Sequence, residues 1–274
     1  MDFSVAISVY KNDKSRDFNR ALESITSLQT VKPAEIVLII DGPVPEEINE
    51  VIAKYESLYP IFNTIRLSEN RGLGNALKIA VETAKCELIA RMDSDDIAMP
   101  NRFEEQLKMF AEDAQLDIVG GDISEFIGEE DNVVSYRKVP MTDAEIKSYM
   151  KVRCPFNHVT VMYKKNAVVK AGGYLDLFWN EDYYLWIRMQ LSGAKFANTG
   201  TTLVNVRTGA NMYARRGGKK YFESEKYLQK YMLKHKIIGR GTYCMNVIKR
   251  WIVQVALPNS IRGWVFRAFA RSKG

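Results

Sequence analysis

Three acidic residues follow a short apolar run near the middle of the chain. The run from Leu88 to Met92 has the length of a buried strand, and Asp93, Asp95 and Asp96 come directly after it. Carboxylates this close together repel one another unless a cation or water lies between them. Because Mg²⁺ and Mn²⁺ prefer oxygen ligands, and Mg²⁺ usually binds one or two carboxylates plus phosphate oxygens of a substrate, the segment indicates a divalent-metal site. The alternative is a solvated acidic turn that precedes the next helix.

A second acidic pair, Glu181 and Asp182, stands where a helix is predicted to begin. Residues 183–191 have helical apolar spacing, and Asn180 comes directly before the pair. Acidic residues in a first helical turn are stabilised by the helix macrodipole, so the pair needs no catalytic role to be explained. The residues alone leave two interpretations open, a helix-start preference and a functional pair of carboxylates.

Apolar runs alternate with helical patterns over the first 92 residues. Strands are predicted over residues 4–10, 35–40, 64–67 and 88–92, and helices over residues 18–28, 45–59 and 72–83 between them. Such alternation is typical of a mostly parallel sheet with helices on both faces. Right-handed crossovers place the carboxyl end of every strand at one edge of the sheet, where ligands bind in open α/β folds. We therefore expect a common rim that carries Tyr10, Asp41, Asn70 and Asp93.

The pattern is less regular after this point. A helix is predicted over residues 102–110, strands over residues 118–126, 133–139 and 158–163, and a helix over residues 165–171. Thr142 and Glu145 form a capping-box pattern that should begin a helix ending near Met150. Because no clear linker divides the chain, the change in charge sets the predicted boundary, with a catalytic domain over residues 1–212 and a basic helical region over residues 213–274.

The net charge of +6 is unevenly distributed. From residue 213 to the end, 15 Lys and Arg stand against two Glu, whereas the rest of the chain has 24 basic and 31 acidic residues. The basic region also carries aromatic and aliphatic side chains at helical spacing, which is typical of a helix that lies in a membrane interface. It contains no recognised nucleic-acid-binding motif, so we expect no nucleic-acid partner. The alternative is packing onto the catalytic domain or onto a second copy of the chain, as a homodimer.

Cysteine content and hydropathy indicate a compartment. The three cysteines, Cys86, Cys154 and Cys244, are too widely spaced to suggest a disulfide framework or a zinc site. The first residues include an acid where a signal peptide has basic residues, and no run approaches the ~20 apolar residues that span a bilayer. We therefore expect a cytoplasmic protein that is soluble or peripheral at the inner face of the cell membrane.

Five short motifs follow one another along the chain. They are Ser8-Val9-Tyr10, Asp41, Asn70-Arg71-Gly72, Asp93-Ser94-Asp95, and Glu181-Asp182 followed by Leu185-Trp186 and Arg188. Taken in this order, they resemble the motifs of the family 2 inverting glycosyltransferases, which have the GT-A fold. The resemblance covers residues 3–207 and implies a Rossmann-like α/β fold, to which a C-terminal helical extension is added. Within the family, residues 90–97 are similar to a segment of the amylovoran-type transferases of bacterial exopolysaccharide and capsule synthesis.

The resemblance implies a nucleotide site and a metal site. Asp41 and Arg71 would hold the base of a nucleotide, and the backbone of Ser8 and Val9 would complete this pocket. Asp95 would coordinate a Mg²⁺ or Mn²⁺ ion that bridges a diphosphate. Further residues expected to bind the nucleotide, by the same resemblance, are Tyr10, Asn70, Gly72, Ser94 and Asp93, the last through the ribose or the metal.

The resemblance also implies roles on the acceptor side. Asp182 would be the general base that takes the proton of an acceptor hydroxyl while its oxygen attacks the anomeric carbon with inversion, and Glu181 would position the acceptor or the base. His158 would reach the diphosphate or the metal, or be structural. Arg215 belongs to a predicted loop that closes on phosphates or contacts a membrane. Apart from the resemblance, the position of the aromatic Trp179 just before the acidic pair predicts that it either stacks on a sugar ring or packs in the core.

The implied function is metal-dependent transfer of a sugar from a nucleotide-diphosphate donor, with UDP the expected nucleotide, to a saccharide or lipid-linked acceptor in bacterial surface-polysaccharide synthesis. Two alternatives remain. Residues 93–97 loosely fit the D-x-D-x-[TV] pattern of haloacid-dehalogenase-like phosphohydrolases, although that pattern belongs near the start of a chain. The protein could also be a catalytically silent module that binds sugar nucleotides.

Overall fold

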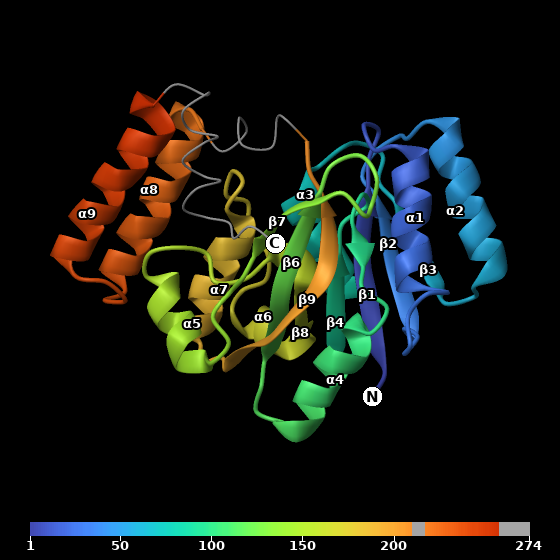
Figure 1. Ribbon diagram of the computed structural model, residues 1–274, viewed down its shortest axis with the longest axis horizontal. Helices are drawn as coiled ribbons and strands as arrows, with labels where there is room; N and C mark the ends of the chain where they lie inside the picture. The colour runs from blue at the N-terminus through green and yellow to red at the C-terminus, as the bar shows by residue number, and fades with distance from the viewer. Residues whose placement is uncertain (210–216, 258–274) are drawn as a thin grey trace.

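Four parallel strands form the first half of the central sheet. The computed structural model, which describes residues 1–209 and 217–257, places them in the order β3-β2-β1-β4 (Figure 1). A helix joins each strand to the next, which confirms the predicted alternation. The elements are β1 (Phe3–Val9), α1 (Ser15–Ile25), β2 (Glu35–Ile40), α2 (Glu46–Leu58), β3 (Phe62–Arg66), α3 (Leu73–Thr83) and β4 (Leu88–Met92).

Mixed pairing extends the sheet beyond β4. Strand β8 (Met162–Lys164) is antiparallel to β4 and to β6 (Ile118–Phe126), and β6 is parallel to β9 (Phe196–Arg207). Strand β9 in turn pairs with the short β5 (Ile97–Ala98). Strand β7 (Val133–Arg137) forms a hairpin with the second half of β6, whereas β8 pairs with its first two residues. Neither β5 nor β9 was predicted. Strand β9 contains the polar stretch 198–202, which breaks the alternation that would have revealed it.

The predicted strand over residues 158–163 is wrong in its first half. Residues His158–Thr160 form a 3₁₀ turn, and β8 begins only at Met162. The carbonyl of Asn157 closes this turn, because it accepts hydrogen bonds from the backbone N–H of Thr160 at 2.9 Å and from its hydroxyl at 2.8 Å. Local hydrogen bonding by a threonine side chain thus competes with the extended conformation that the apolar alternation favoured.

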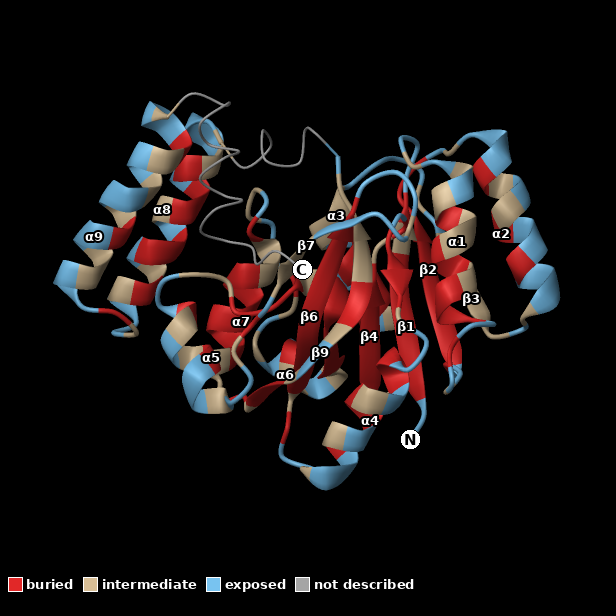
Figure 2. Cartoon of the chain, viewed as in Figure 1, coloured by how far each residue is buried: buried red, intermediate tan, exposed pale blue. Residues whose placement is uncertain are grey.

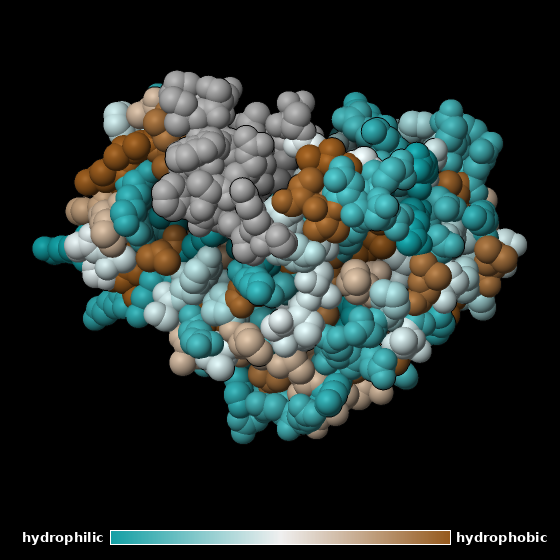
Figure 3. Space-filling model, in the orientation of Figure 1, coloured by the Kyte–Doolittle hydropathy of each residue, from teal (hydrophilic) through white to brown (hydrophobic). Residues whose placement is uncertain are grey.

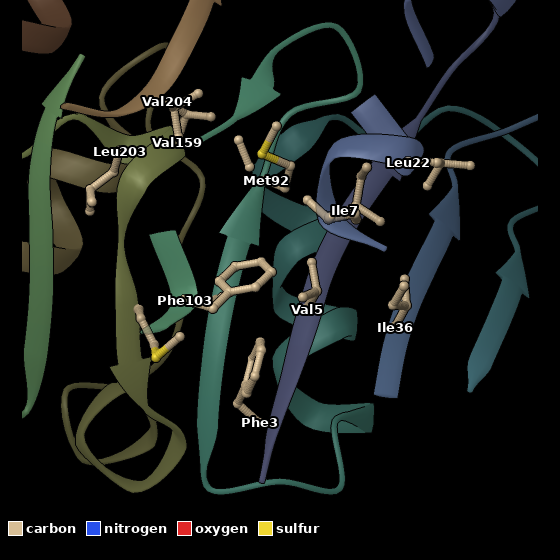
Figure 4. Packing of buried hydrophobic residues seen from close by; sticks show 14 of the residues in the cluster. Phe3, Val5, Ile7, Leu22, Ile36, Met92, Phe103, Val159, Leu203 and Val204 are labelled. Carbon is tan, nitrogen blue, oxygen red and sulfur yellow. The ribbon is translucent and has the colours of Figure 1, made fainter. Parts of the chain in front are cut away.

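Side chains of the strands alternate between two cores, one on each face of the sheet. Ile7 of β1 packs in the same cluster as Leu22 of α1 and Phe103 of α4 (Arg102–Glu112), whereas Ala6 belongs to the cluster that contains α3 (Figure 4). Every residue of β2 is buried, which explains its continuous apolar run. Figure 2 shows the result, a buried sheet between helices whose outer faces are exposed.

The C-terminal helices pack onto the α/β part of the chain. Leu228 and Met232 of α8 (Lys219–Lys234) are buried in the same core as α7 (Glu181–Leu191). Helix α9 (Arg240–Trp251) lies beside α8 and continues into a π-helical turn, Ile252–Ala256. No helix within residues 1–209 and 217–257 is long and apolar enough to cross a membrane. The part of the predicted basic helical region beyond residue 257 lies outside the described residues.

Two shorter helices complete the described chain. Helix α5 (Asp143–Met150) begins with the predicted capping box, since the backbone N–H of Glu145 donates to the Thr142 hydroxyl and the Glu145 carboxylate accepts from the backbone N–H of Thr142. Helix α6 (Lys165–Lys170) follows β8 directly and ends before Gly172, as predicted. Both helices lie on the face of the sheet that also carries α7, so they support the element that presents the second acidic pair.

Candidate active site

The carboxylate of Asp41 fixes the loop that precedes α3. Its Oδ1 accepts a hydrogen bond from the backbone N–H of Arg71 at 2.7 Å, and its Oδ2 accepts from the backbone N–H of Gly72 at 3.0 Å and from the Asn70 side chain at 2.9 Å. Asp41 is buried, whereas Asn70 and Arg71 are exposed. Gly72 has a φ of +84°, a left-handed conformation that glycine adopts without strain. One buried acid therefore shapes three successive residues of the predicted nucleotide-binding loop.

Arg91 of β4 holds the carboxylate of Asp93 through both of its terminal nitrogens. Nη1 donates to Oδ2 at 2.6 Å, and Nη2 donates to Oδ1. The Arg91 side chain is 2% exposed and that of Asp93 is 34% exposed. Burial opposes the charged form of Arg91, but the charge and hydrogen bonds of Asp93 outweigh it and raise the pKa of the guanidinium. Asp93 is thus fixed in one orientation at the end of its strand.

The acidic turn is also tied to the end of β1. The Ser94 hydroxyl donates to Oδ2 of Asp13 at 2.8 Å, and the backbone N–H of Tyr10 donates to the same oxygen at 3.0 Å. The backbone N–H of Asp41 donates to the carbonyl of Val9 at 2.8 Å. The end of β2 is therefore bound to the segment of β1, Ser8 and Val9, whose backbone is predicted to complete the nucleotide pocket. The expected rim at the carboxyl ends of the strands is therefore present, and Asp13 joins two of its parts.

Asp95 and Asp96 lie in opposite environments. Asp95 reaches the surface, and desolvation, followed by the negative charges of Asp93 and Asp13, raises its pKa to about 7. Asp96 is buried and accepts a hydrogen bond from the backbone N–H of Arg207 at 2.8 Å. Burial and the charge of Asp95 raise the pKa of Asp96 well above its usual value. The turn concentrates negative charge that a cation would relieve.

The donor set fits a cation that depends on its substrate for most ligands. Asp95 is exposed, whereas both oxygens of Asp93 are paired with Arg91 and Asp96 is buried. Within the described ranges, no group of three or more His, Cys, Asp or Glu could hold a metal by itself. Mg²⁺ commonly takes only one or two protein carboxylates and completes its shell with phosphate oxygens and water. Asp95 can supply such a carboxylate.

Arg207, at the end of β9, holds the acidic turn from outside. Its Nε donates to the carbonyl of Asp95 at 3.2 Å, and its Nη2 lies 3.2 Å from Oδ1 of Asp17 in α1. Its Nη1 donates to the carbonyl of Gly128 at 3.1 Å, and the guanidinium lies over the ring of Phe126, 4.7 Å from its centroid. One side chain thus connects the turn with α1 and with the β6–β7 hairpin.

An open pocket of about 480 Å³ joins the loop before α3 to the start of α7. A Cβ added to Gly74 would lie 3.7 Å from Cβ of Glu181, so the two helix starts approach closely. The structure therefore brings the predicted base and the predicted nucleotide loop to one cavity. Its lining residues are Arg71, Gly72, Leu73, Gly74, Asn75, His158, Asp176, Phe178, Trp179, Glu181 and Asp182.

The carboxylate of Asp182 is held on both sides. Its Oδ1 accepts from the backbone N–H of Tyr183 at 2.6 Å, and its Oδ2 accepts from the thiol of Cys154, with the sulfur at 3.7 Å. Desolvation raises the pKa of Asp182. Desolvation, and next the charge of Asp182, raise the pKa of Glu181 to about 7. A carboxylate with a raised pKa is a better proton acceptor than an ordinary one, as a general base requires.

His158 lines the same pocket as a neutral side chain. Its Nε2 lies 3.0 Å from the hydroxyl of Tyr174, and its ring packs edge-on against Trp186, with centroids 5.9 Å apart. Desolvation, followed by the charge of Arg91, lowers the pKa of His158 well below its usual value. These surroundings favour a hydrogen-bonding or structural role over that of a cationic phosphate ligand.

Several residues of the site carry no sequence signal of their own. Asp13 stands in a loop outside the five motifs, and Cys154 is one of three scattered cysteines. Arg207 ends a strand that was not predicted. Only the three-dimensional pairing of β9 with β5 and β6 brings this arginine to the acidic turn. Arg215 lies outside the described residues, so its role in a closing loop stays a prediction.

The family described as Glycosyl transferase family 2 matches residues 4–178. The chain belongs to this family and is a glycosyltransferase. The match separates it from the haloacid-dehalogenase-like phosphohydrolases that the acidic turn loosely resembles.

Curated relatives agree along nearly the whole chain. An uncharacterized glycosyltransferase of Haemophilus influenzae is 36% identical over 99% of this chain and 100% of its own length. The amylovoran biosynthesis glycosyltransferase AmsE of Erwinia amylovora is 36% identical, with coverage of 88% and 90%. The UDP-Gal:alpha-D-GlcNAc-diphosphoundecaprenol beta-1,3-galactosyltransferase of Escherichia coli is 34% identical, with coverage of 98% and 96%. The predicted similarity to the amylovoran type is confirmed.

Solved structures show the same fold at low sequence identity. The S. aureus TarS fragment 1–349 in complex with UDP-GlcNAc superposes with a TM-score of 0.68 at 15% identity, over 92% of this chain and 73% of that one. The mannosyltransferase PcManGT of Pyrobaculum calidifontis, in complex with GDP-Man and Mn²⁺, superposes with a TM-score of 0.63 at 14% identity, over 98% and 76%. The GT-A fold predicted from the motifs is confirmed.

Proposed function

We propose that the protein transfers a sugar from a UDP-sugar to a hydroxyl of a saccharide acceptor, with inversion at the anomeric carbon and with Mn²⁺ or Mg²⁺ as cofactor. The observation that carries this proposal is the shared pocket, in which Asp182 of α7 faces the loop that Asp41 shapes. A base on one wall and a nucleotide loop on the other leave room for a sugar between them. UDP is favoured as the nucleotide because the Escherichia coli relative is named for a UDP-Gal donor and the TarS structure contains UDP-GlcNAc.

The chain's own residues account for the main steps. Asp41 and the loop over residues 70–72 hold the nucleotide, and Arg91 keeps Asp93 oriented beside it. Asp182 accepts the proton of the acceptor hydroxyl while a bond forms between the acceptor oxygen and the anomeric carbon and the bond from that carbon to the diphosphate breaks. A divalent cation at Asp95 would neutralise the charge that develops on the departing diphosphate.

The relatives favour a place in bacterial surface-polysaccharide synthesis. One is named for amylovoran biosynthesis, and another is named for an acceptor in which GlcNAc is linked through a diphosphate to undecaprenol. Both cover at least 88% of this chain. We therefore extend the proposal to a lipid-linked saccharide acceptor, which would bring the enzyme to the inner face of the cell membrane.

The exposed face of α9 supports contact with such a membrane. Exposed hydrophobic side chains follow α9 and the π-helical turn after it, and Figure 3 shows brown atoms among hydrophilic ones in this region, at the left of the view. They are Met245, Ile248 and Trp251 of α9, and Ile252 and Val255 of the turn. Their spacing puts them on one side of the helix, which also carries Lys249. Replacing Ile248 and Ile252 by Asp should reduce sedimentation with anionic vesicles. Gel filtration with and without vesicles will separate this contact from homodimer formation through the same face.

The decisive test combines binding with turnover. Calorimetry should show UDP binding that Mn²⁺ strengthens, and the wild type should slowly hydrolyse its UDP-sugar donor. Asp182→Asn should keep UDP binding and lower transfer by about 10² to 10⁴-fold, the usual contribution of a general base. Glu46→Gln is the matched control, because Glu46 is also an acid in the first turn of a helix. Equal losses in both variants, or unchanged transfer in Asp182→Asn, would contradict the role of Asp182 as the base. UDP binding without any transfer in the wild type would indicate a silent binding module.

A further inference from the structure

Trp179 has an unusual backbone conformation directly before the acidic pair. Its φ is +58°, in the left-handed region that bulky side chains rarely adopt. In the described part of the chain, the only other residue besides glycine with a positive φ is Lys236. Backbone strain of this kind persists only where the surroundings impose it, and it is concentrated at functional sites. Glycine or asparagine would adopt this conformation more easily, so the indole itself needs an explanation.

The neighbours of Trp179 impose its conformation. The Ser224 hydroxyl of α8 donates to the carbonyl of Phe178 at 2.8 Å and accepts from the Asn180 side chain at 3.0 Å. The backbone N–H of Asn180 donates to the carbonyl of Leu177 at 2.8 Å, and Asn180 is 3% exposed. The residues on both sides of Trp179 are therefore fixed by the same serine, and the tryptophan between them has to turn outward.

Packing does not explain the indole. Trp179 is 46% exposed, although it lines the pocket that also contains Asp182. The centroids of the Trp179 and Phe178 rings are 5.7 Å apart. The ammonium of Lys220 lies over the Phe178 ring, 4.1 Å from its centroid. The pair forms an open aromatic wall next to the carboxylates. A core residue would lose this exposure, whereas a flat exposed indole suits a ligand with an apolar face.

We infer that Trp179 is the stacking platform for the acceptor, on which the apolar C–H face of a pyranose ring lies so that one hydroxyl points toward Asp182. The inference rests on the proposed function and adds to it the residue that selects a carbohydrate acceptor. Trp179 precedes the base, Asp182, by three positions, so the strained backbone at Trp179 and the start of α7 place platform and base together. A pyranose between them is bounded by an aromatic face and a proton acceptor.

The test separates acceptor binding from donor chemistry. Transfer to a synthetic GlcNAc-α-diphosphate with an alkyl chain, and hydrolysis of the UDP-sugar in its absence, are measured for Trp179→Ala, Trp179→Phe and Trp179→Gly. We expect the Ala and Gly variants to raise the acceptor KM at least tenfold, with Phe in between, and to leave donor hydrolysis and the UDP Kd unchanged. The Gly variant should also have the highest Tm of the three, because it relieves the left-handed strain. Leu175→Ala is the matched control, an exposed apolar residue of the same loop outside the pocket lining.

Direct binding gives a second measurement. Methyl glycosides of glucose, galactose, mannose and N-acetylglucosamine are titrated while tryptophan fluorescence is recorded. At least one should change the emission of the wild type but not that of Trp179→Phe. The inference is overturned if Trp179→Ala weakens UDP binding instead, because the indole would then be a platform for the uracil ring of the nucleotide. It is also overturned if no glycoside changes the emission. Absence of UDP binding and of donor hydrolysis in the wild type would contradict the proposed function itself and is distinguishable from both results.

Discussion

The buried guanidinium of Arg91 and the partly exposed carboxylate of Asp93 form a two-pronged ion pair at the centre of the site. The charge of Arg91 acts on two groups of carboxylates. It favours the ionised form of Asp95 in the acidic turn and of Glu181 and Asp182 at the start of α7, against the larger effect of desolvation, which raises the pKa of all three. A single buried cation therefore opposes the effect of desolvation both on the acidic turn and on the acidic pair at the start of α7.

Replacing Arg91 should disturb both groups of carboxylates at once. Arg91→Lys keeps the charge but loses one prong of the pair, and we expect a decrease of kcat/KM of about tenfold, equivalent to about 1.4 kcal/mol. Arg91→Gln removes the charge, so the carboxyls lose protons less readily and the acidic limb of the pH–rate profile should move to higher pH. The double variant Arg91→Gln with Asp93→Asn should recover thermal stability without recovering activity. An unshifted profile in Arg91→Gln would contradict this role.

Asp41 should control nucleotide affinity through the shape of its loop. Asp41→Asn leaves one acceptor oxygen for three N–H donors, so at least one of them loses its partner, at a cost of about 1–3 kcal/mol. We expect the UDP Kd measured by calorimetry to rise about tenfold, equivalent to about 1.4 kcal/mol. Glu69→Gln is the control, because Glu69 makes an exposed ion pair with Arg71 in the same loop. A Kd changed equally in both variants would indicate general loosening of the loop.

The first half of the fold, and the placement of Asp41, Asn70 and Asp93 at one edge of the sheet, could be predicted for one physical reason. In a parallel sheet, helical crossovers force the carboxyl end of each strand to one edge, so residues far apart in the chain meet wherever strands are identified. The strands were identifiable because β2 and β4 are buried on both faces; β2 is apolar from Ile36 to Ile40, and β4 is apolar except for Arg91. Asp41, Asn70 and Asp93 were placed correctly by this reasoning alone.

The remaining features depend on interactions that no local pattern carries. Strand β9 is polar at residues 198–202, and its long pairing with β6 stabilises it despite this. The 3₁₀ turn at His158 depends on hydrogen bonds between Thr160 and Asn157. The left-handed backbone of Trp179 depends on Ser224, which lies in a helix much later in the chain. Each is set by tertiary contacts, which override local propensity.

The raised pKa values of the acidic pair predict how activity depends on pH. Because Asp182 accepts a proton only when ionised, kcat/KM should rise as pH increases through the range in which the pair titrates, near pH 7 for Glu181. Glu181→Gln removes a neighbouring negative charge, so Asp182 should ionise at lower pH. The acidic limb of the pH–rate profile should therefore move to lower pH. A limb that stays in place would show that Glu181 does not act on the base.

The raised pKa of Glu181 should also make thermal stability depend on pH, but stability should fall as pH rises, whereas activity should increase. The folded-state pKa of Glu181, about 7, lies above its ordinary value of 4.5, so the folded protein binds this proton more tightly than the unfolded chain does. Its stabilising contribution is complete below pH 4.5 and is lost as pH rises through 7. Glu181→Gln should therefore gain Tm relative to the wild type between pH 5 and pH 8, whereas Glu46→Gln should show no such trend. Differential scanning calorimetry at both pH values measures the difference.

Arg207 should determine metal affinity without contacting the metal. Its side chain binds the carbonyl of Asp95 and connects it with Asp17, so Arg207→Ala frees the acidic turn from α1. We expect Mn²⁺ binding in the presence of UDP, followed by electron paramagnetic resonance, to weaken about tenfold, equivalent to about 1.4 kcal/mol. UDP binding measured in EDTA should change little, because the Asp41 loop is untouched. Arg20→Ala is the matched control, since Arg20 pairs with Glu130 between α1 and the same hairpin. If both variants lose Mn²⁺ affinity equally, the hairpin as a whole, and not the arginine on the turn, sets the geometry of the metal site.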